Sequence, residues 1–281
     1  MKQFPLGYVG VGLMGGPMVK RLTGLGWQVR AYDIVPARSS VGSPAEAAKG
    51  ADAVLLNLPT NQAVEDAVFG AQGLAHVLKE TQLLVDFSTI PVEACRTHAA
   101  RLTQATGCRW VDAPVSGGPP AVEAGTLTVM AGGEAADLER LAPLMRDIAG
   151  RVTHMGPVGA GLAAKMINQL IVGVGHAMLG EAVGLCEKAG IDARRIPECL
   201  AVGYADSNVL KAYWPRMVER DFAPRGYVRQ LLKDLEMVNA WASSLHAGTP
   251  MLGAALSAYR KLKGRGDSEL DTSAVVKLYI S

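Results

Sequence analysis

Glycines near the start of this chain recur at a spacing that limits what the first residues can form. Gly10, Gly12 and Gly15 follow the apolar run Leu6–Val9 and open a stretch with helical spacing. In this context a G-x-G-x-x-G series is typical of a dinucleotide-binding turn, because its glycines permit a tight turn, close approach of a diphosphate, and close helix–strand packing. Amide groups at the helix start would bind the anion. An ordinary strand-to-helix turn is the alternative. The candidate cofactor-binding residues are Gly10, Gly12, Leu13, Met14 and Gly15.

An aspartate and an arginine after the first loop favour different cofactors. Asp33 ends the second predicted strand, 18 residues after Gly15. A carboxylate at that point accepts hydrogen bonds from the adenosine ribose and repels a 2′-phosphate, whereas the nearby Arg38 can accommodate that phosphate. The pattern favours NAD and leaves NADP possible.

Strands and helices alternate in the first half of the chain and not in the second. The predicted strands are Leu6–Val9, Trp27–Asp33, Ala53–Leu58, Leu83–Phe87, Arg109–Asp112, Thr126–Ala131 and Arg151–Thr153. Such alternation implies a mostly parallel sheet with helices on its faces. From about Gly161 only helical patterns follow, at Leu162–Ala189, Asn208–Glu219, Tyr227–Ser244, Met251–Lys263 and Ser268–Ile280. We expect a Rossmann-like, doubly wound α/β domain over residues 1–158 and an all-α domain over residues 159–281.

Composition narrows the classes of partner. The formal charge is +2 and 49% of the residues are hydrophobic, which favours an ordered globular protein and gives no electrostatic footprint for nucleic acid or a membrane surface. The four cysteines form no CxxC pair and the five histidines are scattered, so we expect no metal site. Lys2 and the apolar stretch after it resemble a secretory signal, but five glycines would break a signal helix. The apolar run Leu170–Gly180 is too short to span a bilayer. We expect a cytoplasmic protein.

Three polar side chains share one face of the long predicted helix. Lys165, Asn168 and Gln169 lie at i, i+3 and i+4 of an otherwise apolar segment. Polar groups on such a stripe are expected to face a cleft, where a partly desolvated lysine has a lowered pKa and serves as a general base near neutral pH. A lysine in a structural salt bridge is the alternative reading.

A glycine pair follows the fifth predicted strand. Ser116, Gly117 and Gly118 come after a strand end, which is where ligands of open α/β sheets bind. Consecutive glycines expose backbone N–H groups and the serine adds a hydroxyl, so the segment could hold a carboxylate. An ordinary turn is the alternative.

Four motifs in order resemble the β-hydroxyacid dehydrogenase family. They begin at Gly10, Asp112, Lys165 and Lys233, and they read GVGLMGGPM, DAPVSGG continuing to Gly125-Thr126-Leu127, KMINQ, and KDL. The resemblance implies that Lys165 takes the hydroxyl proton while hydride leaves the same carbon for the nicotinamide. It also implies that Ser116, Gly117, Gly118 and Asn168 bind a small carboxylate substrate, that Asp234 orients Lys233, and that the cofactor is bound by Leu58, Pro59, Thr89 and Lys233.

The match is imperfect, and alternatives stay open. The segment after Asp33 is shorter than usual, Ala121 stands where the family commonly has glycine, and Gln169 replaces an asparagine. That glutamine is shared with tartronate semialdehyde reductases and favours a small hydroxylated acid. The alternatives are an imine reductase, which typically lacks the lysine, and a non-catalytic NAD(P)-binding scaffold. The family forms homodimers or homotetramers, and we expect close helix approach along Gly173, Ala177, Gly180 and Gly184.

Overall fold

The computed structural model describes residues 4–280, and the chain divides into two compact units, Met1–Lys165 and Met166–Ser281. Lys2, which entered the comparison with a secretory signal, lies outside the described residues. The division falls inside a long helix, seven residues beyond the domain boundary expected from the sequence. The boundary at residue 158 therefore stays a prediction.

The first unit is built on an eight-stranded sheet, as the alternating pattern predicts. Its strands are β1 (Leu6–Val9), β2 (Val29–Tyr32), β3 (Ala53–Leu56), β4 (Leu83–Asp86), β5 (Arg109–Asp112), β6 (Val115–Ser116), β7 (Leu127–Gly132) and β8 (Ala149–Gly156). The order is β2-β1-β3-β4-β5-β7-β6, with β8 paired to β7. The first five strands are mutually parallel, and β7 runs antiparallel to β5 and β6. The two-residue β6 was not predicted, because it is too short to show an alternating pattern.

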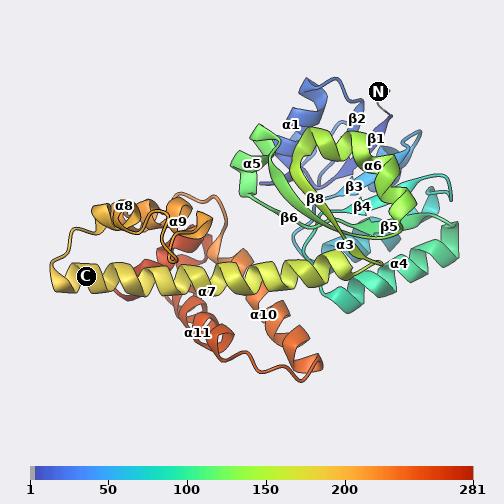
Figure 1. Ribbon diagram of the computed structural model, residues 1–281. Helices are drawn as coiled ribbons and strands as arrows, with labels where there is room; N and C mark the ends of the chain where they lie inside the picture. The colour runs from blue at the N-terminus through green and yellow to red at the C-terminus, as the bar shows by residue number, and fades with distance from the viewer. Residues whose placement is uncertain (1–3, 281) are drawn as a thin grey trace. The chain divides into compact units, whose positions relative to one another are not determined.

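Helices cover both faces of this sheet (Figure 1). One face carries α1 (Gly15–Gly24), α5 (Gly118–Ala124) and α6 (Ala135–Ile148), and the opposite face carries α3 (Asn61–Phe69) and α4 (Val92–Thr106). The short helix α2 (Pro44–Ala48) and the 3₁₀ turns at Pro36–Arg38 and Leu74–His76 complete the unit. Buried side chains such as Tyr8, Met18, Val85 and Leu144 form a core between the sheet and its α1–α5–α6 layer. The doubly wound architecture is confirmed.

Two helix ends are stabilised by residues close to them in the sequence. The hydroxyl of Ser43 accepts a hydrogen bond from the amide of Glu46, so Ser43 caps α2. Gly190 has a φ of +67°, and the amides of Gly190 and Ile191 donate to the carbonyls of Glu187 and Cys186. This pair of bonds is a Schellman motif, which ends the long helix where a glycine is available for the left-handed conformation.

The second unit is helical. It contains most of α7 (Ala160–Ala189), followed by α8 (Ile196–Cys199), α9 (Asn208–Glu219), α10 (Val228–Ser244) and α11 (Pro250–Gly264), with 3₁₀ turns at Ala193–Arg195, Asp267–Glu269 and Thr272–Leu278. The helical segment predicted over Ser268–Ile280 forms these last two 3₁₀ turns in place of one continuous helix. The buried carboxylate of Asp271 accepts hydrogen bonds from the amides of Arg225, Gly226 and Ser273. Side-chain bonds of this kind compete with the helical backbone pattern.

The small residues of α7 pack against their own unit. A Cβ on Gly173 would lie 2.5 Å from Leu235 of α10, and one on Gly184 would lie 2.8 Å from Tyr279 near the C-terminus. Gly180 also lies against Tyr279. At Gly173 the stripe thus serves close approach of another helix within the same chain. Pairing of two copies of the chain stays a prediction.

The apolar stretch of α7 is longer than the Leu170–Gly180 run suggests. The helix has 30 residues, and an 18-residue window within it has a mean hydropathy of 1.4, so length and composition alone would let it cross a membrane. Half of that window is buried inside the structure. The core helix of a water-soluble protein passes the same test of length and composition.

Candidate functional site

The candidate residues of the first unit collect at one edge of the sheet. β1, β3, β4 and β5 are neighbours and parallel, so their carboxyl ends meet at the same edge. The segments that leave this edge contain all the unit's predicted loop residues, namely Gly10–Gly15, Leu58, Pro59, Thr89 and Ser116–Gly118. Ligands of open α/β sheets bind outside this edge.

Each of the three glycines in the first loop is explained by a different feature of the structure. Gly10 has a φ of +99°, and a Cβ there would collide with the carbonyl oxygen of Asn57. A Cβ on Gly15 would collide with the carbonyl oxygen of Gly10. A Cβ on Gly12 would meet nothing within 4 Å. Gly12 therefore borders open space beside the first turn of α1, which has no acidic residue, and the loop fits a dinucleotide diphosphate.

Asp33 is tied to this loop. One oxygen of its carboxylate accepts a hydrogen bond from the amide of Val11 at 2.7 Å, and the other accepts from the amide of Val35 at 2.9 Å. Each carboxylate oxygen can accept a second bond, so the group can still receive a ribose hydroxyl. Arg38 is exposed at the end of a 3₁₀ turn. Both groups that bear on the choice of cofactor therefore lie in the segment that follows β2.

Sequence reasoning missed a buried network between β3 and β4. The hydroxyl of Ser88 accepts a hydrogen bond from the amide of Leu58 at 2.9 Å, and the Asp86 carboxyl accepts one from the amide of Ser88 at 2.8 Å. Burial raises the pKa of Asp86 to about 7. The network holds the turns that carry Leu58, Pro59 and Thr89. An aspartate at the end of an apolar strand was the available signal.

Lys165 is buried beside the predicted substrate loop. The side chain is 7% exposed, and its Nζ donates a hydrogen bond to the carbonyl oxygen of Val115 at 2.7 Å. Val115 and Ser116 form β6, and Gly117 and Gly118 both have positive φ angles. The structure thus places the amine next to the Ser116–Gly118 segment. Pro119 and Pro120 lie in the first turn of α5, where a missing N–H costs no helical hydrogen bond.

The candidate residues of the second unit form a chain of polar contacts. The Asn168 amide donates to Gln169 Oε1 at 2.8 Å, and Gln169 Nε2 donates to the carboxylate of Asp234 at 2.6 Å. Lys233 Nζ lies 3.2 Å from the other oxygen of Asp234. A carboxylate accepts only from the NH₂ end of Gln169, so its oxygen must face Asn168. Asp234 therefore decides which way both amides point.

Three aromatic residues of the second unit, Tyr204, Trp214 and Tyr227, have different environments. Trp214 is 2% exposed, and its indole N–H donates to the carbonyl oxygen of Ala193. Tyr204 is fully exposed. Arg229 lies over the ring of Tyr227, 4.5 Å from its centroid. Trp214 is thus a core residue.

The described residues 4–280 contain no group of three or more His, Cys, Asp or Glu side chains that could hold a metal ion. Cys95, Cys108 and Cys186 are buried free thiols, and Cys199 is an exposed one.

Comparison with known families matches the two halves of the chain to two models. Residues 5–156 match the NAD-binding domain of 6-phosphogluconate dehydrogenase. Residues 159–279 match the family described as NAD-binding of NADP-dependent 3-hydroxyisobutyrate dehydrogenase. The fold and these matches define an NAD(P)-dependent oxidoreductase that acts on CH–OH groups.

Named relatives identify the family. The chain is 36% identical to an NAD-dependent L-serine dehydrogenase of Pseudomonas aeruginosa, with 99% of this chain and 98% of the relative covered. It is 32% identical to a 2-hydroxy-3-oxopropionate reductase of Escherichia coli, with 97% and 96% covered. A Mycobacterium tuberculosis 3-hydroxyisobutyrate dehydrogenase solved with L-serine has a TM-score of 0.87 at 30% identity, covering 99% of each chain. The chain belongs to the β-hydroxyacid dehydrogenase family.

Proposed function

We propose that this enzyme interconverts a small β-hydroxy acid and its aldehyde or ketone, with Lys165 as the general acid and base. The observation that carries the proposal is the burial of Lys165 with its Nζ 2.7 Å from the Val115 carbonyl, directly beside Ser116. An amine held there can take a hydroxyl proton during oxidation and return it during reduction.

Other residues of the chain bind and orient the substrate and the cofactor. The nicotinamide cofactor supplies the hydride acceptor. The amides of Gly117 and Gly118 and the hydroxyl of Ser116 hold the substrate carboxylate, and Asn168 binds its hydroxyl or carboxylate. On the cofactor side, Gly10–Gly15 bind the diphosphate, whereas Leu58, Pro59, Thr89 and Lys233 line the nicotinamide side.

The choice of cofactor is NAD under this proposal. Asp33 presents a carboxylate at the end of β2, and its negative charge opposes the 2′-phosphate of NADP. Arg38 is exposed five residues later and leaves weaker use of NADP open. The enzyme is therefore expected to prefer NAD without excluding NADP.

The substrate class is a C3 or C4 hydroxy acid. Relatives named for L-serine and 2-hydroxy-3-oxopropionate act on three-carbon acids. The resemblance of Gln169 to tartronate semialdehyde reductases favours the same class. Trp214 is buried in the core at 2% exposure, so its ring is not available to a larger substrate side chain. Serine, glycerate and 3-hydroxyisobutyrate are the first candidates.

The test is NADH formation at 340 nm with these acids and with threonate and phenylserine, using NAD and NADP separately. Lys165→Ala should lower kcat by about a hundredfold to ten-thousandfold, because general acid–base catalysis contributes roughly 10²–10⁴, while NAD affinity stays unchanged. Lys188→Ala, an exposed lysine on the same helix, is the matched control. Wild-type turnover by the Lys165 variant would refute the assignment.

Two other functions predict different results. An imine reductase would reduce a cyclic imine and show no activity on hydroxy acids, and the presence of Lys165 argues against it. A non-catalytic scaffold would bind NAD tightly with no turnover on any acid tested. Retention of Lys165, Asn168 and Ser116 argues against that reading as well.

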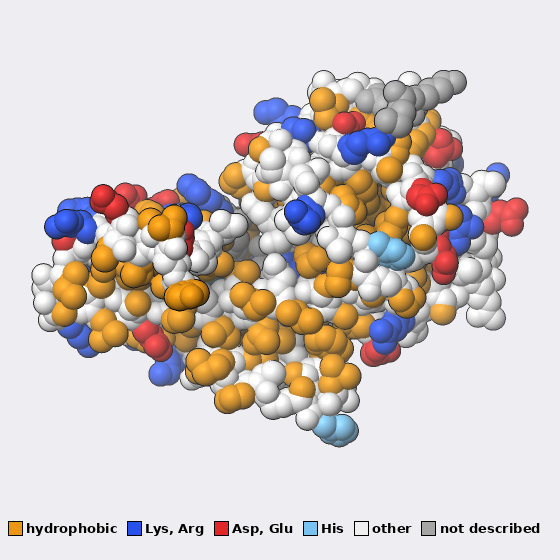
Figure 2. Space-filling view, viewed as in Figure 1, with side chains coloured by type: hydrophobic (Ala, Val, Ile, Leu, Met, Phe, Trp, Pro, Cys, Tyr) orange, Lys and Arg blue, Asp and Glu red, His pale blue; other side chains and the backbone are white. Residues whose placement is uncertain are grey.

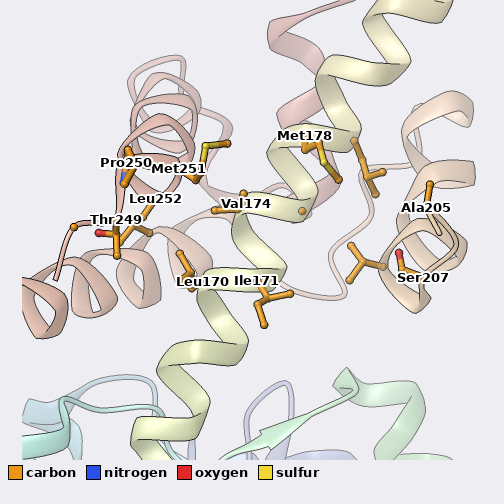
Figure 3. Close-up of a pocket in the computed structure, with 14 residues that line it drawn as sticks. Leu170, Ile171, Val174, Met178, Ala205, Ser207, Thr249, Pro250, Met251 and Leu252 are labelled. Carbon is orange, nitrogen blue, oxygen red and sulfur yellow. The ribbon is translucent and has the colours of Figure 1, made fainter.

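The enzyme is proposed to be cytoplasmic and to work as a homodimer or homotetramer that pairs through the helical unit. Ile171, Met178 and Met251 are more than half exposed there. They border a groove of about 540 Å³ lined by α7, the segment before α9, and the start of α11 (Figure 3). Figure 2 shows hydrophobic side chains gathered over this unit. A second copy is the proposed occupant, since half of the apolar window of α7 is not buried within one chain.

Light scattering tests this pairing. Ile171→Glu places a charge in the groove and should reduce the mass to that of one chain. Val202→Glu, at a residue that is 99% exposed and outside the groove, should leave the mass unchanged. A wild-type mass equal to that of a single chain at micromolar concentration would refute the proposal.

A further inference from the structure

The carboxylate of Asp112 binds the beginning of the helix that carries Lys165. Asp112 ends β5 and is fully buried. One of its oxygens accepts a hydrogen bond from the amide of Gly159 at 2.7 Å, and the other accepts from the amide of Leu162 at 2.8 Å. These amides belong to the start of α7, where backbone N–H groups have no partner within the helix. Asp112 therefore acts as a cap supplied from 47 residues earlier in the chain.

Two glycines make this close contact possible. A Cβ on Gly161 would lie 2.8 Å from the carbonyl oxygen of Asp112 and 2.9 Å from its carboxylate, and it would collide with the carbonyl of Met130. A Cβ on Gly132 would collide with the same carboxylate and lie 2.9 Å from the amide of Gly161. Neither residue has a positive φ that would itself demand glycine. Their missing side chains serve the packing of α7 against Asp112 and β7.

Segment 112–115 also contacts α7 at Lys165, beyond the residues that Asp112 binds. Val115, three residues after Asp112, accepts the hydrogen bond from Lys165 Nζ at 2.7 Å. The carboxylate thus holds the backbone at Gly159 and Leu162, and the carbonyl holds the side chain at Lys165. A negative charge at a helix N-terminus also interacts favourably with the helix dipole. Segment 112–115 therefore fixes the position of Lys165 relative to Ser116.

We infer that Asp112 is a positioning residue for Lys165, setting the placement of the amine through the first turn of α7. The inference rests on the proposed role of Lys165. Asp112 itself touches neither the hydroxyl proton nor the hydride in this scheme. Its loss should impair proton transfer more than it impairs binding.

Asp112→Asn is the direct test. The amide keeps one acceptor and turns an NH₂ group toward a backbone N–H, so one end of the cap is lost. Displacement of a catalytic group by about 1 Å can lower the rate by about 10²-fold. We expect kcat to fall by roughly ten- to a hundredfold, with the KM of the acid and the Kd of NAD within about twofold of wild type. The D₂O effect on kcat should rise as proton transfer becomes slower.

Asp137→Asn is the matched control. Asp137 is also a buried aspartate of this unit, 1% exposed, and it bonds Arg109 rather than α7. Assays are run well below the Tm of each variant, so that both are folded. The control should lose stability but keep its kcat and its D₂O effect. Parallel losses of kcat in both variants, with unchanged D₂O effects, would overturn the inference.

A second variant reaches the same contact from the helix side. Gly161→Ala should move the first turn of α7 away from Asp112 and lower kcat in the same way. Gly24→Ala, at a helical glycine with open space around it, should have no effect on kcat. If Asp112→Asn does not fold, the comparison of Gly161→Ala with Gly24→Ala tests the inference instead. Wild-type kcat in a folded Gly161→Ala variant would overturn it.

Hydrogen exchange separates this inference from the proposed function. The amides of Gly159 and Leu162 should exchange faster in Asp112→Asn than in the wild type, whatever the role of Lys165. If Lys165→Ala stays active, the proposed function fails although the cap is real. If Lys165→Ala is inactive and Asp112→Asn keeps wild-type kcat, only the positioning role fails.

Discussion

The carboxylate of Asp33 accepts a hydrogen bond from the backbone N–H of Val11 at 2.7 Å, which joins the end of β2 to the glycine-rich loop. One residue thus shapes the diphosphate loop and presents the charge expected to oppose NADP. The two roles can be separated by experiment, because a neutral acceptor keeps the first and removes the second.

Asp33→Asn and Asp33→Ala should differ in a defined way. The asparagine keeps an acceptor for Val11, so it should mainly raise activity with NADP relative to NAD. The alanine loses that bond as well, and hydrogen bonds to charged groups contribute about 1.5–3 kcal/mol, which corresponds to an increase of about tenfold or more in the KM for NAD. Initial rates with both cofactors measure this. Asp52→Ala, at an exposed aspartate before β3, is the control, and an unchanged cofactor ratio in both Asp33 variants would contradict the prediction.

Gly12 and Gly15 should respond differently to the same substitution. Gly12→Ala projects a methyl group into open space, so the protein should keep the wild-type Tm and lose NAD affinity by at least about tenfold, since glycine there serves approach of the diphosphate. Gly15→Ala meets the carbonyl of Gly10 and should lower the Tm itself. Thermal unfolding with and without NAD separates the two. A wild-type NAD affinity in Gly12→Ala would place the diphosphate elsewhere.

Asp86 should make the protein less stable as the pH rises. Burial raises its pKa to about 7, and an unfolded aspartate titrates near 3.9, so the folded state holds the proton more tightly. The free energy of unfolding should therefore fall between about pH 4 and pH 7. Asp86→Asn mimics the protonated form and should be more stable than wild type at pH 8, by on the order of 2 kcal/mol, with little difference at pH 4.5. Urea unfolding at both pH values measures this, and a variant that is less stable at pH 8 would contradict it.

His176 should make the protein less stable as the pH falls, in contrast to Asp86. The ring lies on α7 with its centroid 3.9 Å from that of Tyr213, and within the described residues neither nitrogen has a hydrogen-bond partner. Burial lowers the pKa of His176 to about 4, below the 6.5 of an unfolded histidine. The stability that the neutral ring contributes is present above pH 6.5 and is lost as the pH falls towards 4. The loss should be on the order of 3 kcal/mol.

Comparison of two histidine variants tests this. His176→Leu should flatten the decline in the free energy of unfolding between pH 6.5 and 4.5. His246→Asn, at an exposed histidine of the same unit with a φ of +53°, should keep the wild-type slope. Equal slopes in the wild type and the His176 variant would show that the ring is hydrated in the folded state.

Much of the fold could be predicted because it depends on short-range patterns. The strand Leu6–Val9 and the helix Asn208–Glu219 were predicted with the bounds that the structure has. The long helix was predicted to end at Ala189, as α7 does. Residues 268–280 were predicted as one helix and form separate 3₁₀ turns. The break lies at Asp271, whose carboxylate binds amides 45 and 46 residues earlier in the chain. Periodicity carries no information about such distant partners.

The candidate site also combines local features, which the sequence shows, with long-range contacts, which it does not. Glycine spacing, the carboxylate of Asp33 and the polar stripe from Lys165 to Gln169 are local, so the sequence alone determined the class of cofactor fold and the residues worth testing. Only the tertiary structure decided that the carboxylate of Asp112 caps α7, that the Val115 carbonyl holds Lys165, and that Asp234 orients Gln169. These contacts join residues about 50 positions or more apart, and they form because sheet packing and buried hydrogen bonding bring strand ends and helix starts together.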